Sequence, residues 1–133
     1  MSMKTVILGA MLAVLTGSAA NAACPGELVA MRVSKLKPGG SMAGFAEAAK
    51  ANAKWYIDHG LKADRFITAP VYEQSDGEAK ASVTKVLTIH VYGGTEMPKH
   101  DAGWDAFVAK YKANSSIESE TRACLPKGTI AGK

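Results

Sequence analysis

The chain has 133 residues, 47% of them hydrophobic and 21% charged, and carries a formal net charge of +4 at pH 7. Its basic residues are scattered and not clustered among aromatics, which argues against a nucleic-acid partner. Beyond the N-terminal segment no apolar run approaches the roughly 20 residues that cross a bilayer, so we expect no membrane span in the mature chain.

The first 22 residues have the pattern of a secretory signal peptide. Lys4 gives a positive start, Val6–Leu15 is uninterrupted apolar sequence, and Ala20-Asn21-Ala22 has the A-x-A form of a signal-peptidase site. We therefore expect residues 1–22 to be removed and residues 23–133 to form a single domain, periplasmic or secreted. About 110 residues are enough for a modest hydrophobic core.

The chain has only two cysteines, Cys24 and Cys124, at opposite ends of the mature part. Such a pair in an exported domain most often forms a disulfide. The alternative is that Cys24 carries a lipid, but a lipobox needs an aliphatic residue where this chain has Asn21. We predict the disulfide.

The first third of the mature chain predicts a strand followed by a helix. Glu27–Leu36 alternates with period two, as a half-buried strand does, and Lys37-Pro38-Gly39-Gly40 ends it. Ser41 is a good N-cap for a helix that begins at Met42, has apolar residues at helical spacing, and stops at about Gly60.

Two further strands and a turn come next. The first runs from about Arg65 to Glu73, and Pro70 inside it predicts a sheet edge, because proline cannot donate to the ladder. The polar stretch 74–80, centred on Asp76-Gly77, predicts a turn. Val83–Tyr92 is rich in β-branched residues and predicts a central strand.

The last third predicts a second helix and a final strand. Asp101 is a suitable cap, and residues 114–116 end the helix. Four large apolar residues lie at i, i+3, i+4 and i+7, namely Trp104, Phe107, Val108 and Tyr111. Residues 117–125 form a more polar strand, and we expect 126–133 to be a loose tail.

The predicted order β-α-β-β-α-β is that of a ferredoxin-like α+β domain. Right-handed crossovers give a four-stranded antiparallel sheet in the order 4-1-3-2, with both helices on one face. The start of the first strand then lies beside the end of the last. Cys24 and Cys124 sit at those two places, so the disulfide and the topology, inferred separately, agree.

The chain resembles the dimeric α+β barrel superfamily, which includes antibiotic-biosynthesis monooxygenases, NIPSNAP-type proteins, stress-responsive barrel domains and haem-degrading monooxygenases. The resemblance rests on the strand order, on Lys35-Leu36-Lys37-Pro38-Gly39 after the first strand and on Trp104-Asp105-Ala106-Phe107 in the second helix. It implies a homodimer that pairs through open sheet faces, and a pocket for a small molecule between sheet and helices. It does not select a reaction.

His90 is the polar residue of most interest, because it shares a strand face with Thr88 and Tyr92. Arg32 lies on the neighbouring strand, in a register that the sequence does not fix. Polar groups on a covered sheet face need partners. They form either a structural hydrogen-bonded cluster or the polar part of a binding pocket.

Trp55 and His59 lie four residues apart on the first predicted helix. Such a pair could line a pocket beside the helix. The alternative is a partly exposed aromatic and a solvated histidine near the helix C-terminus, where a positive charge suits the helix dipole.

No metal, phosphate-binding or dinucleotide motif is present, so we expect no metal and no cofactor. The haem-degrading relatives use an Asn, a Trp and a His, but here Asn52, Trp55 and His59 all fall on one helix. The expected function is therefore binding of a small, largely apolar molecule. The ligand-binding candidates are Arg32, Trp55, His59, His90 and Tyr92.

The alternative is a cofactor-independent monooxygenase, or a lyase or cyclase, acting on a phenolic or quinol-like substrate. In that chemistry His90 or His59 would be the catalytic group that takes or holds a proton, and Arg32 or Tyr92 would stabilise an oxyanion.

Overall fold

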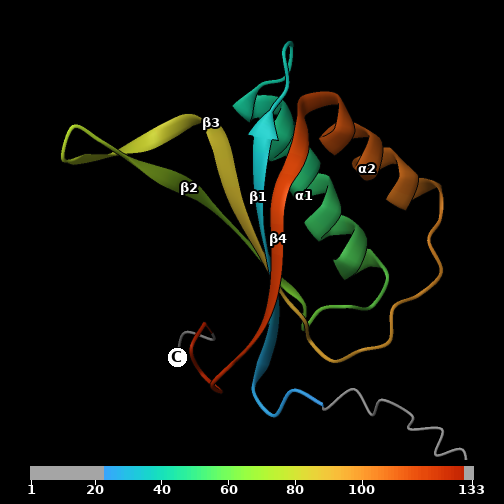
Figure 1. Cartoon of the computed structure of the whole chain (residues 1–133). Helices are drawn as coiled ribbons and strands as arrows, with labels where there is room; N and C mark the ends of the chain where they lie inside the picture. Colours follow the sequence, from blue (N-terminus) through green and yellow to red (C-terminus); the bar gives the residue numbers. More distant parts are fainter. Residues whose placement is uncertain (1–22, 131–133) are drawn as a thin grey trace, which may run out of the picture.

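The computed structural model describes residues 23–130, so the predicted signal peptide lies outside the described residues. Six elements follow one another: β1 (Glu27–Leu36), α1 (Met42–Asp58), β2 (Arg65–Ser75), β3 (Glu78–Val91), α2 (Ala102–Asn114) and β4 (Ser115–Leu125). The strands form one antiparallel sheet in the order β2-β3-β1-β4, and both helices cover the same face of it (Figure 1). The ferredoxin-like α+β fold predicted from the sequence is confirmed.

Both helices begin at the predicted caps. Ser41 Oγ accepts a hydrogen bond from the Gly44 amide at 2.9 Å, and Asp101 Oδ1 accepts one from the Trp104 amide at 3.0 Å. These bonds satisfy amide groups that have no partner within the first turn of a helix. Within the described residues no helix is long and apolar enough to span a membrane.

The β2–β3 connection is tighter than the expected turn over residues 74–80. Asp76 and Gly77 both have positive φ angles, 52° and 80°, which is the geometry of a two-residue type I′ turn. The strands therefore continue up to the turn, and the hairpin projects away from the helices at the left of Figure 1. β2 is an edge strand, as Pro70 predicts, and β3 is central.

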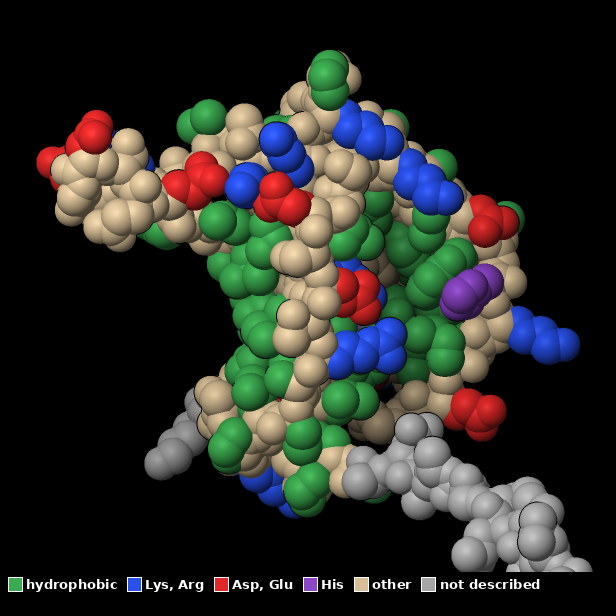
Figure 2. All heavy atoms as spheres, viewed as in Figure 1, with side chains coloured by type: hydrophobic (Ala, Val, Ile, Leu, Met, Phe, Trp, Pro, Cys, Tyr) green, Lys and Arg blue, Asp and Glu red, His purple; other side chains and the backbone are tan. Residues whose placement is uncertain are grey.

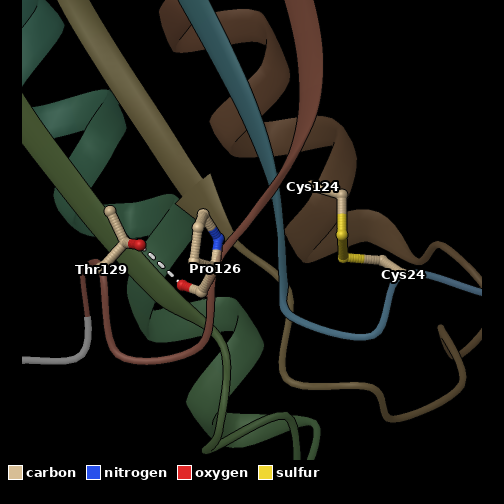
Figure 3. Close-up of a disulfide and its surroundings, with 4 residues drawn as sticks. All are labelled: Cys24, Cys124, Pro126 and Thr129. Carbon is tan, nitrogen blue, oxygen red and sulfur yellow. Dashed lines mark hydrogen bonds between the residues drawn. A yellow bond between two sulfur atoms is a disulfide. The ribbon is translucent and has the colours of Figure 1, made fainter.

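The disulfide between Cys24 and Cys124 is present, with the two Cα atoms 5.6 Å apart (Figure 3). It ties the chain before β1 to the end of β4, where Leu28 pairs with Cys124. The pairing predicted from the topology is thus confirmed. A disulfide is consistent with an oxidising, extracytoplasmic location.

The segment after β4 is held in place over its described part. The Thr129 hydroxyl donates to the Pro126 carbonyl at 2.6 Å (Figure 3), and the Ile130 amide donates to the Glu27 carboxylate at 2.9 Å. Residues 126–130 therefore form an anchored turn, where the sequence predicts a loose tail. Residues 131–133 lie outside the described part of the chain.

The hydrophobic core lies mainly between the two helices. Trp55, Tyr56, Leu61 and Phe107 form a buried cluster, each 4% exposed or less. The helices pack on each other through this cluster and stand partly off the sheet. That arrangement leaves space between the helices and the centre of the sheet.

Candidate functional site: a cavity between sheet and helices

A cavity of about 1060 Å³ lies between the helix-covered face of the sheet and the two helices. In Figure 2 the molecule is hollowed between β4 and the helices, with hydrophobic side chains along the hollow. Its apolar walls include the large side chains of Phe45, Phe66, Trp104, Phe107 and Val108. This volume is at the upper end of the range for small-molecule sites.

The floor of the cavity is a row of polar residues that crosses the sheet. Strand pairing sets Thr68 on β2 opposite Thr88 on β3, Thr88 opposite Arg32 on β1, and Arg32 opposite Glu120 on β4. All four side chains line the cavity. Thr68 and Glu120 are exposed and Arg32 and Thr88 are half-buried, so these polar side chains face open space and not packed apolar groups.

His90 forms a buried pair with Asp64 at one side of this floor. His90 Nε2 lies 2.6 Å from Asp64 Oδ2, and the two side chains are only 5% and 4% exposed. The other carboxylate oxygen accepts a hydrogen bond from the Gly93 amide at 2.9 Å. Burial lowers the pKa of His90, and the hydrogen bond to Asp64 only partly opposes this shift.

A neutral His90 has its tautomer set by Asp64. Nε2 must carry the proton, because it faces a carboxylate that can only accept. Nδ1 is then unprotonated, and it makes no hydrogen bond within residues 23–130. His90 therefore brings a hydrogen-bond acceptor or proton acceptor to a site that it lines.

Aromatic rings hold the imidazole of His90 in position. It stacks on Phe66 with the ring centres 4.4 Å apart and lies 4.0 Å from the ring of Tyr92. The ring of Tyr56 meets it edge-on at 5.1 Å. Burial raises the pKa of Tyr56 to about 12, so its phenol remains a hydrogen-bond donor at neutral pH.

Asn52 on α1 lines the cavity and carries a buried acceptor without a partner in the described residues. Asn52 Nδ2 lies 3.4 Å from the Tyr111 hydroxyl, a long hydrogen bond, and both residues line the cavity. Asn52 Oδ1 is buried and has no hydrogen-bond partner in the described structure. Such a group costs about 1–3 kcal/mol unless a ligand or water donates to it.

The structure brings together three of the five ligand-binding candidates. Arg32, His90 and Tyr92 all line the cavity, whereas Trp55 and His59 do not. Arg32 lies on β1 and His90 on the neighbouring β3, where it is two residues beyond Thr88, the partner of Arg32, and Tyr92 follows directly after the end of β3.

Trp55 and His59 instead join the two helices. Trp55 Nε1 donates to Asp101 Oδ1 at 2.7 Å, and His59 Nε2 lies 2.7 Å from Asp101 Oδ2. His59 Nδ1 faces the Trp55 carbonyl, also at 2.7 Å, and its ring stacks on the indole. We call Trp55, His59 and Asp101 the helix clamp, since they tie the end of α1 to the start of α2.

The clamp predicts an unusual pH dependence for the contribution of His59 to stability. The Trp55 carbonyl, and then Asp101, raise the pKa of His59 above its ordinary 6.5. Protonated His59 is thus favoured in the folded state, so its contribution is complete below about pH 6.5 and is lost as the pH rises through the higher folded-state value. Urea unfolding at about pH 6 and about pH 9 should show a smaller difference between wild type and His59→Gln at the higher pH.

Ala109→Gln, a neutral change on the exposed side of α2, is the matched control for that measurement. Its difference from wild type should not follow the same course. A wild-type advantage over His59→Gln that is constant across the range would contradict the assignment of a protonated clamp.

Sequence reasoning missed several residues of the site, among them Tyr56 and Glu120, and it also missed Asp64, the partner of His90. The only signal for it is an acidic residue immediately before β2, and such residues are common in turns. Its distance from His90 depends on the strand register, which contains a bulge. Tyr72 pairs with Ala81 but Pro70 pairs with Val86, so two steps on β2 match five on β3.

No protein-family model, curated protein or solved structure matches this chain. The ferredoxin-like topology is therefore the level at which the chain is classified. Within the described residues no group of three or more His, Cys, Asp or Glu side chains is arranged to hold a metal ion.

Proposed function

We propose that this is an exported, dimeric α+β barrel protein that binds a small, largely apolar molecule between its sheet and its helices. The observation that carries the proposal is the cavity of about 1060 Å³, with aromatic walls and a floor of convergent polar groups. Ligand sites typically combine these two features.

The polar groups of the cavity favour a ligand over a purely structural role. Asn52 Oδ1 is buried without a partner, and His90 Nδ1 makes no hydrogen bond in the described part of the chain. A structural cluster would pair such atoms with each other. Both residues line the same cavity from opposite sides, Asn52 on α1 and His90 on β3.

The export proposal rests on the signal-peptide pattern of residues 1–22 together with the disulfide. The proposal of a homodimer is based on the sheet face that the helices leave uncovered. On β1 and β3 this face carries apolar side chains in register, Met31 with Ile89 and Val33 with Leu87, and all four are only half-buried.

Sedimentation velocity at micromolar protein should therefore give a dimer. A second copy packed on this face would remove its apolar side chains from water. Leu87→Glu should yield a monomer, whereas Thr88→Glu on the opposite face should remain dimeric. A wild-type monomer at all concentrations would contradict the proposed pairing.

The alternative is a cofactor-independent enzyme, a monooxygenase or a lyase or cyclase, acting on a phenolic or quinol-like substrate. The Asp64–His90 pair favours it, because a carboxylate that orients a neutral histidine leaves the second ring nitrogen able to take a proton. Of the two catalytic candidates this role falls to His90, since His59 belongs to the helix clamp.

Native mass spectrometry of the protein purified from its own compartment tests the proposal. Wild type should carry a bound small molecule that is released on denaturation. Ala49 lies on α1 in the cavity wall, so Ala49→Phe should obstruct part of the space and lower the fraction of protein that carries the added mass. Ala109→Phe, on the exposed side of α2, should retain it. An unchanged fraction in Ala49→Phe would count against this cavity as the site.

A further inference from the structure

The charged residues around the cavity are mostly of one sign. Six charged side chains line it and five of them are basic, namely Arg32, Lys37, Lys50, Lys112 and Arg122, with Glu120 as the acidic one. A concave site with such an excess concentrates anions and disfavours cations.

Arg32 is the basic group at the centre of the floor. Its Nε donates to Glu120 Oε2 at 2.8 Å, and no other hydrogen bond is formed by its guanidinium within residues 23–130. A guanidinium has five N–H donors, so the four on its terminal nitrogens remain available. They form a planar fork that fits a carboxylate through two parallel hydrogen bonds.

Glu120 does not neutralise this part of the site. Arg122 Nε lies 3.5 Å from its second carboxylate oxygen, so one carboxylate is shared by two guanidinium groups. The other nearby acid, Asp64, is already bonded to His90 and to the Gly93 amide. Arg32, Arg122 and Glu120 together therefore keep a net positive charge. The side chain of Arg32 is 31% exposed, so it is partly shielded from water.

Neutral donors accompany the Arg32 charge. Tyr56 and Tyr111 both line the cavity. Burial raises the pKa of both phenols, and the positive charge of Arg32 partly opposes that rise. The same charge also contributes to the lowered pKa of His90. Arg32 thus lies within electrostatic range of three polar groups that face the same space.

We infer that the ligand is a carboxylate-bearing molecule with an aromatic or aliphatic body, its carboxylate bound by the terminal nitrogens of Arg32. The body lies against the aromatic wall formed by Phe45, Phe66 and Phe107. The inference rests on the proposed function and adds the chemical class of the ligand to it.

A matched pair of probes tests the inference. Naphthoate and naphthamide have the same ring system, and only the first carries a charge. Isothermal titration calorimetry on the mature, disulfide-bonded protein should give at least about tenfold tighter binding of naphthoate. Arg32→Gln should abolish that preference, whereas Arg65→Gln, an arginine outside the cavity, should keep it.

Glu120→Gln provides a second variant, with an effect of opposite sign. It releases Arg32 from its protein partner, so naphthoate should bind several-fold more tightly and naphthamide unchanged. This result is decisive even if Arg32→Gln fails to fold. Added salt should weaken the binding of naphthoate alone.

The outcomes separate this inference from the proposed function. Equal binding of the two probes to wild type, or a preference that survives in Arg32→Gln, overturns the carboxylate assignment and leaves the cavity as a binding site. Failure of both probes to bind at millimolar concentration overturns the inference and counts against the binding function as well.

Discussion

Replacing both cysteines, as Cys24→Ser with Cys124→Ser, is expected to lower the free energy of unfolding by up to about 4.7 kcal/mol. The bond joins residues 100 apart in sequence, so it restricts nearly the whole unfolded chain. In a domain of this size the loss is a large fraction of the total stability. Urea unfolding of the double variant and wild type at the same pH measures it.

Titration of free thiols in the denatured, unreduced wild type is the control, and it should find none. The folded double variant should retain the far-ultraviolet circular dichroism of wild type, because β1 and β4 stay paired along their length. An unchanged unfolding midpoint would mean that the bond does not limit the unfolded chain.

His90→Ala is expected to destabilise the protein by about 3 kcal/mol. The change leaves the buried carboxylate of Asp64 without its imidazole partner, and uncompensated buried charges are among the most destabilising features known. Asp64→Ala combined with His90→Ala should lose less than the sum of the two single changes, because the partners are removed together. Thr88→Ala, on the same sheet face, is the control and should have a small effect.

His90→Gln separates the structural role from a role in binding. A glutamine amide can still donate to Asp64 but does not reproduce Nδ1 of the imidazole. Thermal unfolding with and without the retained ligand should show most of the apo stability preserved and the ligand-induced stabilisation lost. Full ligand-induced stabilisation in His90→Gln would assign His90 to the core alone.

The pH dependence at His90 has the opposite sign to that of the clamp. Because its pKa is lowered in the folded state, the unfolded chain takes up a proton first, below about pH 6.5. Its contribution to stability is therefore complete above that pH and declines as the pH falls toward the lower folded-state value. Comparison of His90→Gln and His59→Gln should reveal these two trends.

The elements of this fold could be predicted because their signals are local. Alternation over residues 27–36 marks β1, Ser41 and Asp101 cap the helices, and Pro70 restricts β2 to an edge. Right-handed crossovers then leave one sheet order, which places the two cysteines together. The residues at which β2 ends and β3 begins could not be predicted from the sequence, since they depend on the backbone conformation of Asp76 and Gly77 at the turn.

The sequence also allowed the prediction that Arg32, His90 and Tyr92 face the cavity, since residues two apart on a strand share a face. Asp64, the partner of His90, could not be predicted in this way. A bulge that adds three residues to β3 changes both the register and the face, so Asp64 cannot be matched to His90 by counting from the turn.

The tertiary structure alone decided which polar residues belong to the site. By sequence Trp55 and His59 were candidates either for a pocket or for the helix surface, but the start of α2 brings Asp101 to them and makes them a helix clamp. The cavity itself exists because the helices pack against each other and stand off the sheet. Periodicity identifies which side of an element is buried, but the distance between two buried surfaces depends on the side chains of both.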